Sequence, residues 1–104
     1  MAYFPFTDLH SFKDYISFVY ICAPDEFPER EGVSPDEQWT LDLAFEGLHY
    51  GLKLTADEKG NLPVLTTCRA LVDEAHVHYH EGRMREGFFT LEAMAKLIRK
   101  LPSQ

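Results

Sequence analysis

Apolar side chains recur at helical spacing along the C-terminal part of this chain. Between Pro63 and Gly82, one stripe contains Val64, Leu65, Cys68, Leu71, Val72, Ala75 and Tyr79. After a short break, a second stripe contains Phe88, Leu91, Met94, Ala95 and Ile98. A short helix with such a stripe is stable in water only when another element covers the stripe. The pattern therefore predicts two helices, over residues 63–81 and 84–100, in a mainly helical fold.

Two further helices are predicted in the N-terminal half. Leu9, Phe12, Ile16 and Val19 recur at helical spacing. Thr7-Asp8 supplies an N-cap and Pro24 would stop the helix, so we expect it over residues 8–22. Ser34-Pro35-Asp36-Glu37 combines a serine cap, a proline at the first helical position and a glutamate at the third. This capping box predicts a helix over residues 35–54.

Residues 39–54 also fit a different pattern. Trp39, Leu41, Leu43 and Phe45 alternate with polar or small residues, and a turn at Glu46-Gly47 would pair them with the residues that follow. Short apolar segments often satisfy both periods. Because of the capping box we favour the helix. The predicted fold class is all-α, an irregular four-helix bundle, with an α+β fold carrying a β-hairpin at 39–54 as the alternative.

Length and composition predict one helical domain over residues 1–104. A chain of 104 residues with 45% hydrophobic residues has room for a single core. Its longest apolar run, Phe18–Ala23, is far shorter than the roughly 20 residues that cross a bilayer, and the first residues lack the features of a secretion signal. Cys22 and Cys68 are too few for a disulfide scaffold. We therefore expect a cytoplasmic protein with reduced cysteines and no membrane partner.

Negative charge is concentrated in one segment. The formal net charge is −7, and residues 1–60 carry twelve acids against four bases. Residues 25–37, called here the acidic loop, contain one base, Arg30, and six acids: Asp25, Glu26, Glu29, Glu31, Asp36 and Glu37. Such a surface repels a phosphate backbone and attracts a basic protein. We therefore predict a basic protein partner and no nucleic acid.

Two aromatic residues complete the predicted partner surface. Phe89 falls on the polar side of the last predicted helix, and Trp39 follows directly after the acidic loop. Helix packing is expected to bury much of Trp39 and Tyr50, and aromatic surface left exposed beside the loop would anchor a partner. The predicted binding residues are therefore the six loop acids together with Trp39 and Phe89.

A metal site is the alternative function. On a helix, Asp73, His76 and His80 lie on one stripe, and Glu46 and His49 form a second carboxylate–imidazole pair. Two such pairs on facing helices are typical of metal sites in bundles. However, Arg69 shares the first stripe, which favours a solvated polar face opposite the core. No cofactor is therefore predicted, and the metal site remains the second hypothesis.

The residue patterns that mark common catalytic sites do not appear. Cys68 lies among apolar residues, where a thiol is unreactive. The serines occupy capping or exposed positions, and the six glycines stand apart from one another, so no phosphate-binding loop is present. The sequence thus predicts a protein that is not an enzyme.

Two resemblances support a helical binding protein. Tyr79, Gly82, Gly87, Leu91 and Met94 resemble the small-residue pattern of a tetratricopeptide-like helical hairpin, here spanning residues 63–100. This resemblance implies a tight turn at Gly82 and close helix packing at Gly87.

The acidic loop, the segment from Trp39 to Leu54 and the turn from Tyr79 to Gly87 are similar to those of small acidic helical immunity proteins of bacteria. Such proteins neutralise a toxin by occupying its active site. The resemblance implies an antitoxin-type inhibitor that sequesters a basic partner.

Overall fold

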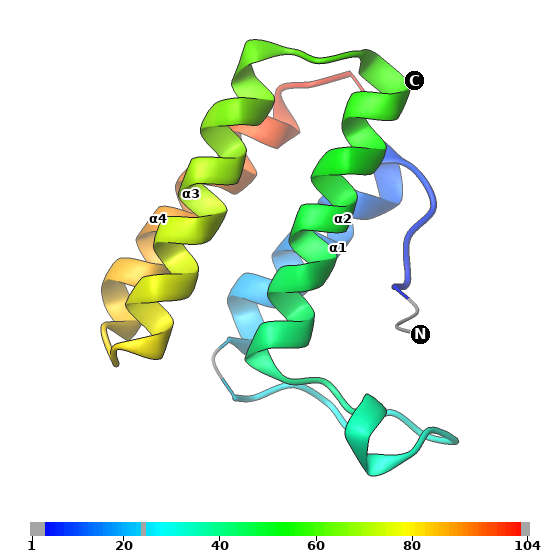
Figure 1. Ribbon diagram of the computed structural model, residues 1–104, viewed down its shortest axis with the longest axis vertical. Coiled ribbons are helices and arrows are strands. Elements are labelled where there is room, and N and C mark those ends of the chain that lie inside the picture. The colour runs from blue at the N-terminus through cyan, green and yellow to red at the C-terminus, as the bar shows by residue number, and fades with distance from the viewer. Residues whose placement is uncertain (1–3, 24, 103–104) are drawn as a thin grey trace.

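The computed structural model describes residues 4–23 and 25–102, which form four α-helices and one 3₁₀ turn (Figure 1). The elements are α1 (Leu9–Cys22), the 3₁₀ turn η1 (Pro35–Glu37), α2 (Leu41–Lys59), α3 (Pro63–His80) and α4 (Met84–Arg99). The described residues contain no strand, so the all-α prediction is confirmed and the β-hairpin at 39–54 is wrong.

The four helices form a closed ring in which each contacts its two neighbours. α3 packs most extensively on α4, and α1 closes the ring by contacting both α2 and α4. Two polar contacts join α1 to the C-terminal end of the chain: Lys13 Nζ donates to the Leu101 carbonyl at 2.5 Å, and Arg99 donates to the Tyr20 hydroxyl at 2.9 Å. The first and last helices are thereby held side by side.

The core lies inside this ring. Its largest fully buried side chains come from all four helices: Phe12, Phe45, Leu9, Ile16, Leu48, Leu52, Leu65, Leu91, Met94, Ile98, Val19 and Val72. Thr55 is the one buried polar residue among the described residues, and its hydroxyl donates to the Gly51 carbonyl at 2.8 Å. Burial of the predicted stripes confirms the helical periodicity seen in the sequence.

The structure confirms α1 almost residue for residue. Asp8 caps it, because its carboxylate accepts from the Ser11 backbone N–H at 2.9 Å while the Ser11 hydroxyl accepts from the Asp8 N–H. This is a capping box with its roles filled by aspartate and serine. Pro24, which was expected to stop the helix, lies outside the described residues.

The predicted start of α2 is wrong by six residues. Ser34 to Glu37 form only the 3₁₀ turn η1, where the Ser34 hydroxyl donates to the Asp36 carboxylate at 2.6 Å. Gln38 explains why the helix does not continue. Its side chain accepts from the Arg30 N–H at 2.6 Å and donates to the Arg30 carbonyl at 2.8 Å, while its own backbone is extended.

Thr40 supplies the cap that Ser34 does not. Its hydroxyl accepts from the Leu43 N–H at 3.1 Å, and α2 begins at the next residue. At the other end the helix continues five residues beyond the predicted boundary, to Lys59. It stops at Gly60, whose φ of 90° lies in the region that favours glycine.

The predicted bounds of α3 and α4 agree with the structure to within one residue. Gly82 forms the turn between them with a φ of 81°, and a Cβ added at Gly87 would lie only 3.0 Å from the Tyr79 ring. Gly82 therefore forms the turn between α3 and α4, and Gly87 allows their close contact.

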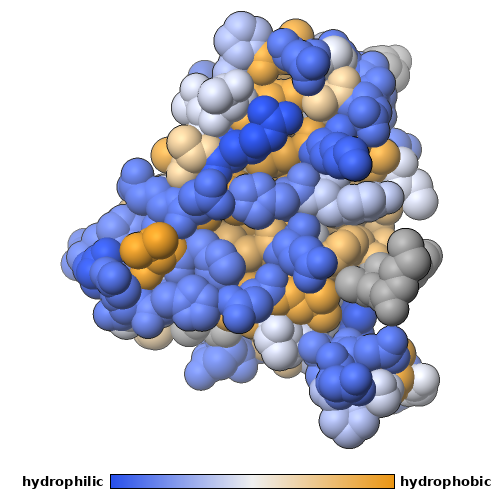
Figure 2. All heavy atoms as spheres, in the orientation of Figure 1, coloured by the Kyte–Doolittle hydropathy of each residue, from blue (hydrophilic) through white to orange (hydrophobic). Residues whose placement is uncertain are grey.

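Figure 2 shows one broad face of the molecule, formed largely by α2 and α3. Hydrophilic side chains cover most of it, and the η1 region projects as a mostly hydrophilic lobe. Among the described residues, no helix is both long enough and apolar enough to cross a membrane.

Candidate metal centre

Helices α2 and α3 run antiparallel, joined at one end by residues 60–62 (Figure 1). The start of α2 therefore lies beside the end of α3. Along the boundary between them, called here the α2–α3 seam, lie five polar side chains: Asp42, His49, Asp73, His76 and His80. The sequence placed the two histidines of α3 on a solvated face opposite the core. The structure corrects this placement, because they border α2.

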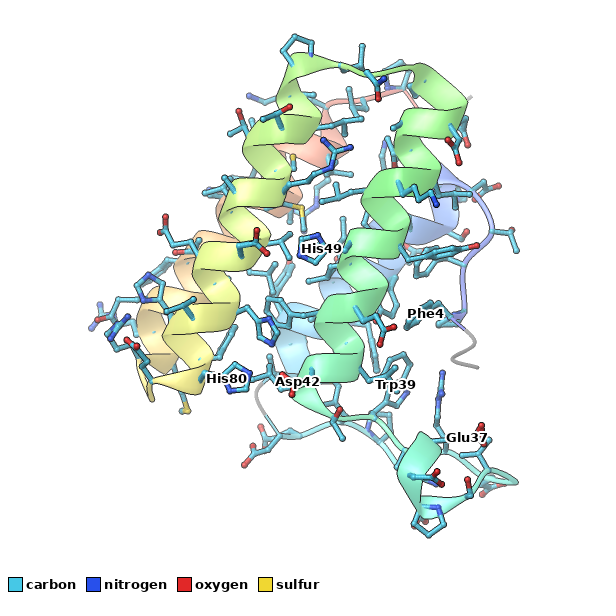
Figure 3. All side chains as sticks on the ribbon, viewed as in Figure 1. Phe4, Glu37, Trp39, Asp42, His49 and His80 are labelled. Carbon is cyan, nitrogen blue, oxygen red and sulfur yellow. The ribbon has the colours of Figure 1, made fainter. Side chains whose placement is uncertain are left out.

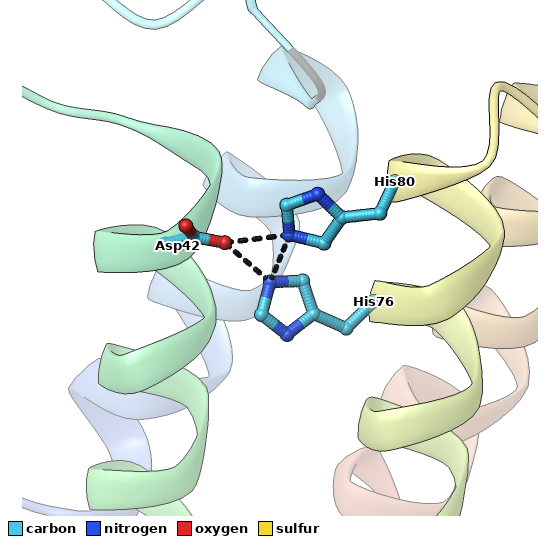
Figure 4. A group of neighbouring side chains, drawn as sticks. All are labelled: Asp42, His76 and His80. Carbon is cyan, nitrogen blue, oxygen red and sulfur yellow. Dashed lines mark hydrogen bonds and ion pairs between the residues drawn. The ribbon is translucent and has the colours of Figure 1, made fainter.

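Asp42, His76 and His80 converge at the open end of this seam and are called here the Asp–His cluster (Figure 4). Asp42 Oδ1 lies 2.8 Å from His76 Nε2 and 2.7 Å from His80 Nε2. The two Nε2 atoms are 3.1 Å apart. One carboxylate oxygen and two imidazole nitrogens thus form a compact triangle of donor atoms.

Packing fixes one side of this triangle. The His76 ring stacks on the buried ring of Phe45, with centroids 4.5 Å apart and planes inclined by 11°. The His80 ring in turn contacts the His76 ring at 4.7 Å. Because Phe45 is fully buried, the core of the bundle orients the imidazole that faces Asp42.

Charge also favours this arrangement. Hydrogen bonds from His76, and then from His80, lower the pKa of Asp42 below its usual value of 3.8. Asp42 lies in the first turn of α2 and His80 in the last turn of α3. A carboxylate near a helix N-terminus interacts favourably with the helix dipole. The dipole of α2 and the two imidazole hydrogen bonds therefore both stabilise the ionised form of Asp42.

The triangle has the dimensions of a metal-binding face. An octahedral ion with ligands at about 2.1 Å holds adjacent donors about 3.0 Å apart, and a tetrahedral ion holds them about 3.4 Å apart. The observed edges of 2.7, 2.8 and 3.1 Å are closest to the octahedral spacing. The Asp42 and His80 side chains are 70% and 53% exposed, so the remaining coordination positions would face solvent.

His49 and Asp73 form a separate pair farther along the seam. His49 Nε2 lies 2.9 Å from Asp73 Oδ1. In Figure 3, His49 lies between α2 and α3 toward the linked end, whereas Asp42 and His80 face each other near the open end. Glu46 is exposed and does not belong to the Asp–His cluster. Of the five residues in the metal hypothesis, the structure therefore brings only His76 and His80 into it.

Sequence reasoning missed Asp42 as a ligand, although a signal for it exists. In an antiparallel helical hairpin, residues at equal distances from the connection face each other. Asp42 lies 19 residues before Asn61 and His80 lies 19 residues after it. His49 and Asp73 lie 12 residues before and after the same position. Both observed pairs therefore follow from the position of the connection.

All residues of the acidic loop, 25–37, are described, and its six acids are exposed. Trp39 is half-buried against Phe18, Phe27 and Tyr15 (Figure 3). Tyr50 is 49% exposed, so its expected burial is wrong: it contacts Phe4 and Phe6 at the margin of the core.

Phe89 is 52% exposed on α4, which lies on the opposite side of the molecule from the acidic loop (Figure 1). Its neighbours are Phe88 and Arg85 of the same helix. The structure therefore does not bring Phe89 together with Trp39 and the acidic loop.

No protein-family model, curated protein sequence or solved structure matches this chain. Its function is therefore inferred from the geometry and chemistry of the residues described above.

Proposed function

We propose that this protein binds a divalent first-row transition metal ion through Asp42, His76 and His80. The observation that carries the proposal is the convergence of three donor atoms, all within 4.8 Å of one another, from two helices. Imidazole nitrogen suits zinc, copper, iron, cobalt and nickel better than magnesium or calcium, which prefer oxygen. Two nitrogens and one oxygen therefore favour a transition metal.

Two variants distinguish the Asp–His cluster from the rest of the seam. His80→Ala removes one donor atom, and Asp42→Asn removes the charge of the carboxylate. Both side chains are largely exposed, so the fold should persist. His49→Ala is the matched control, because it removes a seam histidine outside the cluster. We expect calorimetric titration with zinc and cobalt to show one site, with affinity at least tenfold weaker in the two cluster variants.

The absorption spectrum of bound cobalt provides a second measurement, because tetrahedral and octahedral cobalt differ strongly in intensity and colour. Failure to bind either ion at micromolar concentration would contradict the proposal. Equal losses in His80→Ala and His49→Ala would also contradict it, since they would indicate nonspecific association with surface histidines.

We propose protein binding through the acidic loop as a second function, of the antitoxin type that the sequence resemblance implies. Two observations support it. The loop exposes its six acids, and the two-way bridge between Gln38 and Arg30 gives it a defined shape. Exposed charge of one sign accelerates association with a partner of the opposite sign.

Both cysteines are free thiols, which supports a cytoplasmic location.

The second function is tested by capture from a lysate of the source cells at low and moderate salt. The triple variant Glu26→Gln, Glu29→Gln, Glu31→Gln should recover less of any basic partner than the wild type, with less sensitivity to salt. Equal recovery by both proteins at every salt concentration would exclude the loop as the attracting surface.

A further inference from the structure

A groove of about 310 Å³ lies beside α1, on the side where the chain before α1 and the segment after the acidic loop meet. It is lined by Pro5, Ser11, Asp14, Tyr15, Phe18 and Trp39. This groove is called here the aromatic groove. It contains none of the metal-site residues.

Three rings form its walls. Phe18 and Trp39 lie 5.3 Å apart at 57°, and Tyr15 lies 5.9 Å from each of them. The Tyr15 hydroxyl donates to the Ala44 carbonyl at 2.9 Å, which fixes this ring between α1 and α2. The face of an aromatic ring is electron-rich and attracts cations.

One charged side chain lines the groove. This is Asp14, which is exposed. Arg30 is not among the lining residues, but its guanidinium lies against the Trp39 ring. Phe27 of the acidic loop contacts both Phe18 and Trp39, at 5.8 and 6.2 Å. The acidic loop therefore adjoins the aromatic groove, and its six exposed acids favour a positively charged ligand there.

The chain itself shows that Trp39 accepts a cation. The guanidinium carbon of Arg30 lies 4.1 Å from the centroid of the Trp39 ring. Arg30 is held there by the acidic loop, since its Nη1 donates to the Glu37 carbonyl at 3.2 Å. A guanidinium against this indole is therefore a contact that the structure already contains.

We propose that the aromatic groove binds a lysine or arginine side chain of a basic protein. The cationic group lies against the half-buried rings of Phe18 and Trp39 and forms an ion pair with Asp14. This inference rests on the second proposed function: the acidic loop attracts the partner, and the groove holds one of its side chains.

The sole tryptophan of the chain provides the measurement, since Trp39 is part of the groove. The probes are three short glycine-serine peptides that carry four arginines, four lysines or four citrullines. Citrulline has nearly the shape of arginine without its charge. We expect the arginine and lysine peptides to change Trp39 fluorescence saturably, and the citrulline peptide to leave it unchanged.

Two substitutions test the groove itself. Asp14→Asn and Phe18→Leu should each weaken the affinity for the arginine peptide about three- to tenfold, through loss of the ion pair or of a ring face. Asp57→Asn is the matched control, because it removes an exposed carboxylate on α2 that does not line the groove. Circular dichroism of each variant checks that the helices are retained.

The loop variant Glu26→Gln, Glu29→Gln, Glu31→Gln separates the two proposals. It should slow association but retain the full Trp39 response at saturation. One outcome would overturn the groove proposal and leave the loop proposal standing. In that outcome the peptides bind in a salt-dependent way, Trp39 fluorescence does not change, and Asp14→Asn binds with wild-type affinity. Equal binding of the citrulline peptide would overturn a cationic occupant. Absence of binding by any peptide would count against both.

Discussion

Gly51 determines how closely α1 and α2 approach. A Cβ at this position would overlap the ring of Phe12, which is fully buried in the core. Gly47, one turn earlier, similarly faces Tyr15, and a Cβ there would come within 2.9 Å of Phe4. A glycine inside a helix costs about 1 kcal/mol relative to alanine. In α2 this cost is offset by aromatic packing that no larger residue permits.

Replacing Gly51 with alanine should therefore destabilise the protein despite the better helix propensity of alanine. We expect the free energy of unfolding to fall by about 1–3 kcal/mol, as measured by urea denaturation, because overpacking forces the Phe12 ring to move. In a Phe12→Leu background the same substitution should cost less. An equal cost in both backgrounds would show that Phe12 is not the obstacle.

Cys68 gives the protein a pH dependence in the alkaline range. Burial raises the pKa of its thiol from 9.0 to about 11. The unfolded chain therefore loses this proton at lower pH than the folded protein does. The resulting stability is fully present below pH 9 and is lost as the pH rises toward 11, by about 2 kcal/mol.

The measurement compares urea unfolding of the wild type and Cys68→Ala between pH 8 and pH 11. Groups common to both proteins cancel in the difference, so the wild type should lose more stability over this interval. Parallel decreases in the two proteins would assign the alkaline sensitivity to other groups.

At the scale of single helices, the start of α2 depends on Thr40. Its hydroxyl satisfies the Leu43 N–H, whereas the Ser34 hydroxyl bonds to side-chain carboxylates. Thr40→Ala should lower the free energy of unfolding by about 1 kcal/mol, and Ser34→Ala should have little effect. Thermal or urea denaturation of the two variants measures both values. The reverse order would restore the capping box at Ser34 as the true helix start.

The same element shows what the sequence can predict. The bounds of α1, α3 and α4 followed from signals within a few residues of each end, such as Asp8 and Gly82. The capping box at Ser34 is an equally good local signal, but it competes with the bridge between Gln38 and Arg30. That bridge joins residues eight positions apart in an irregular loop. Such a contact follows no helical or strand period, so the sequence pattern does not predict it.

At the scale of the whole molecule, a metal ion in the Asp–His cluster would hold α2 against α3. A ligand that binds only the folded state at one hundred times its Kd stabilises it by about 2.7 kcal/mol. For a domain of this size the melting temperature should rise on the order of 10 °C. Calorimetry with and without zinc measures the rise, and a chelator should reverse it. In His80→Ala, whose affinity is expected to be at least tenfold weaker, the rise should be at most about half as large, and an equal rise in that variant would place the ion elsewhere.

The candidate site was only partly predictable because ligands on different helices depend on register. The spacing of His76 and His80 on one helix was visible in the sequence. Their partner on α2 was missed because the pairing of Asp42 with His80 requires a connection at residues 60–62, whereas the predicted helix ended at residue 54. The presence of Arg69 on the same stripe led to the wrong prediction that the stripe faces solvent opposite the core. A charged residue on a stripe does not decide whether a neighbouring helix borders that stripe.

The link between α2 and α3 lies far from the Asp–His cluster, so a small rotation of α2 at the link would move Asp42 by a large distance. Asp42 lies 17 residues before Lys59, or about 26 Å along α2 at about 1.5 Å per residue. A rotation of about one degree at the link would displace Asp42 by roughly 0.5 Å. This displacement is about the difference between octahedral and tetrahedral donor spacing. The backbone of Gly60, at the other end of α2, therefore contributes to the position of Asp42 relative to His76 and His80.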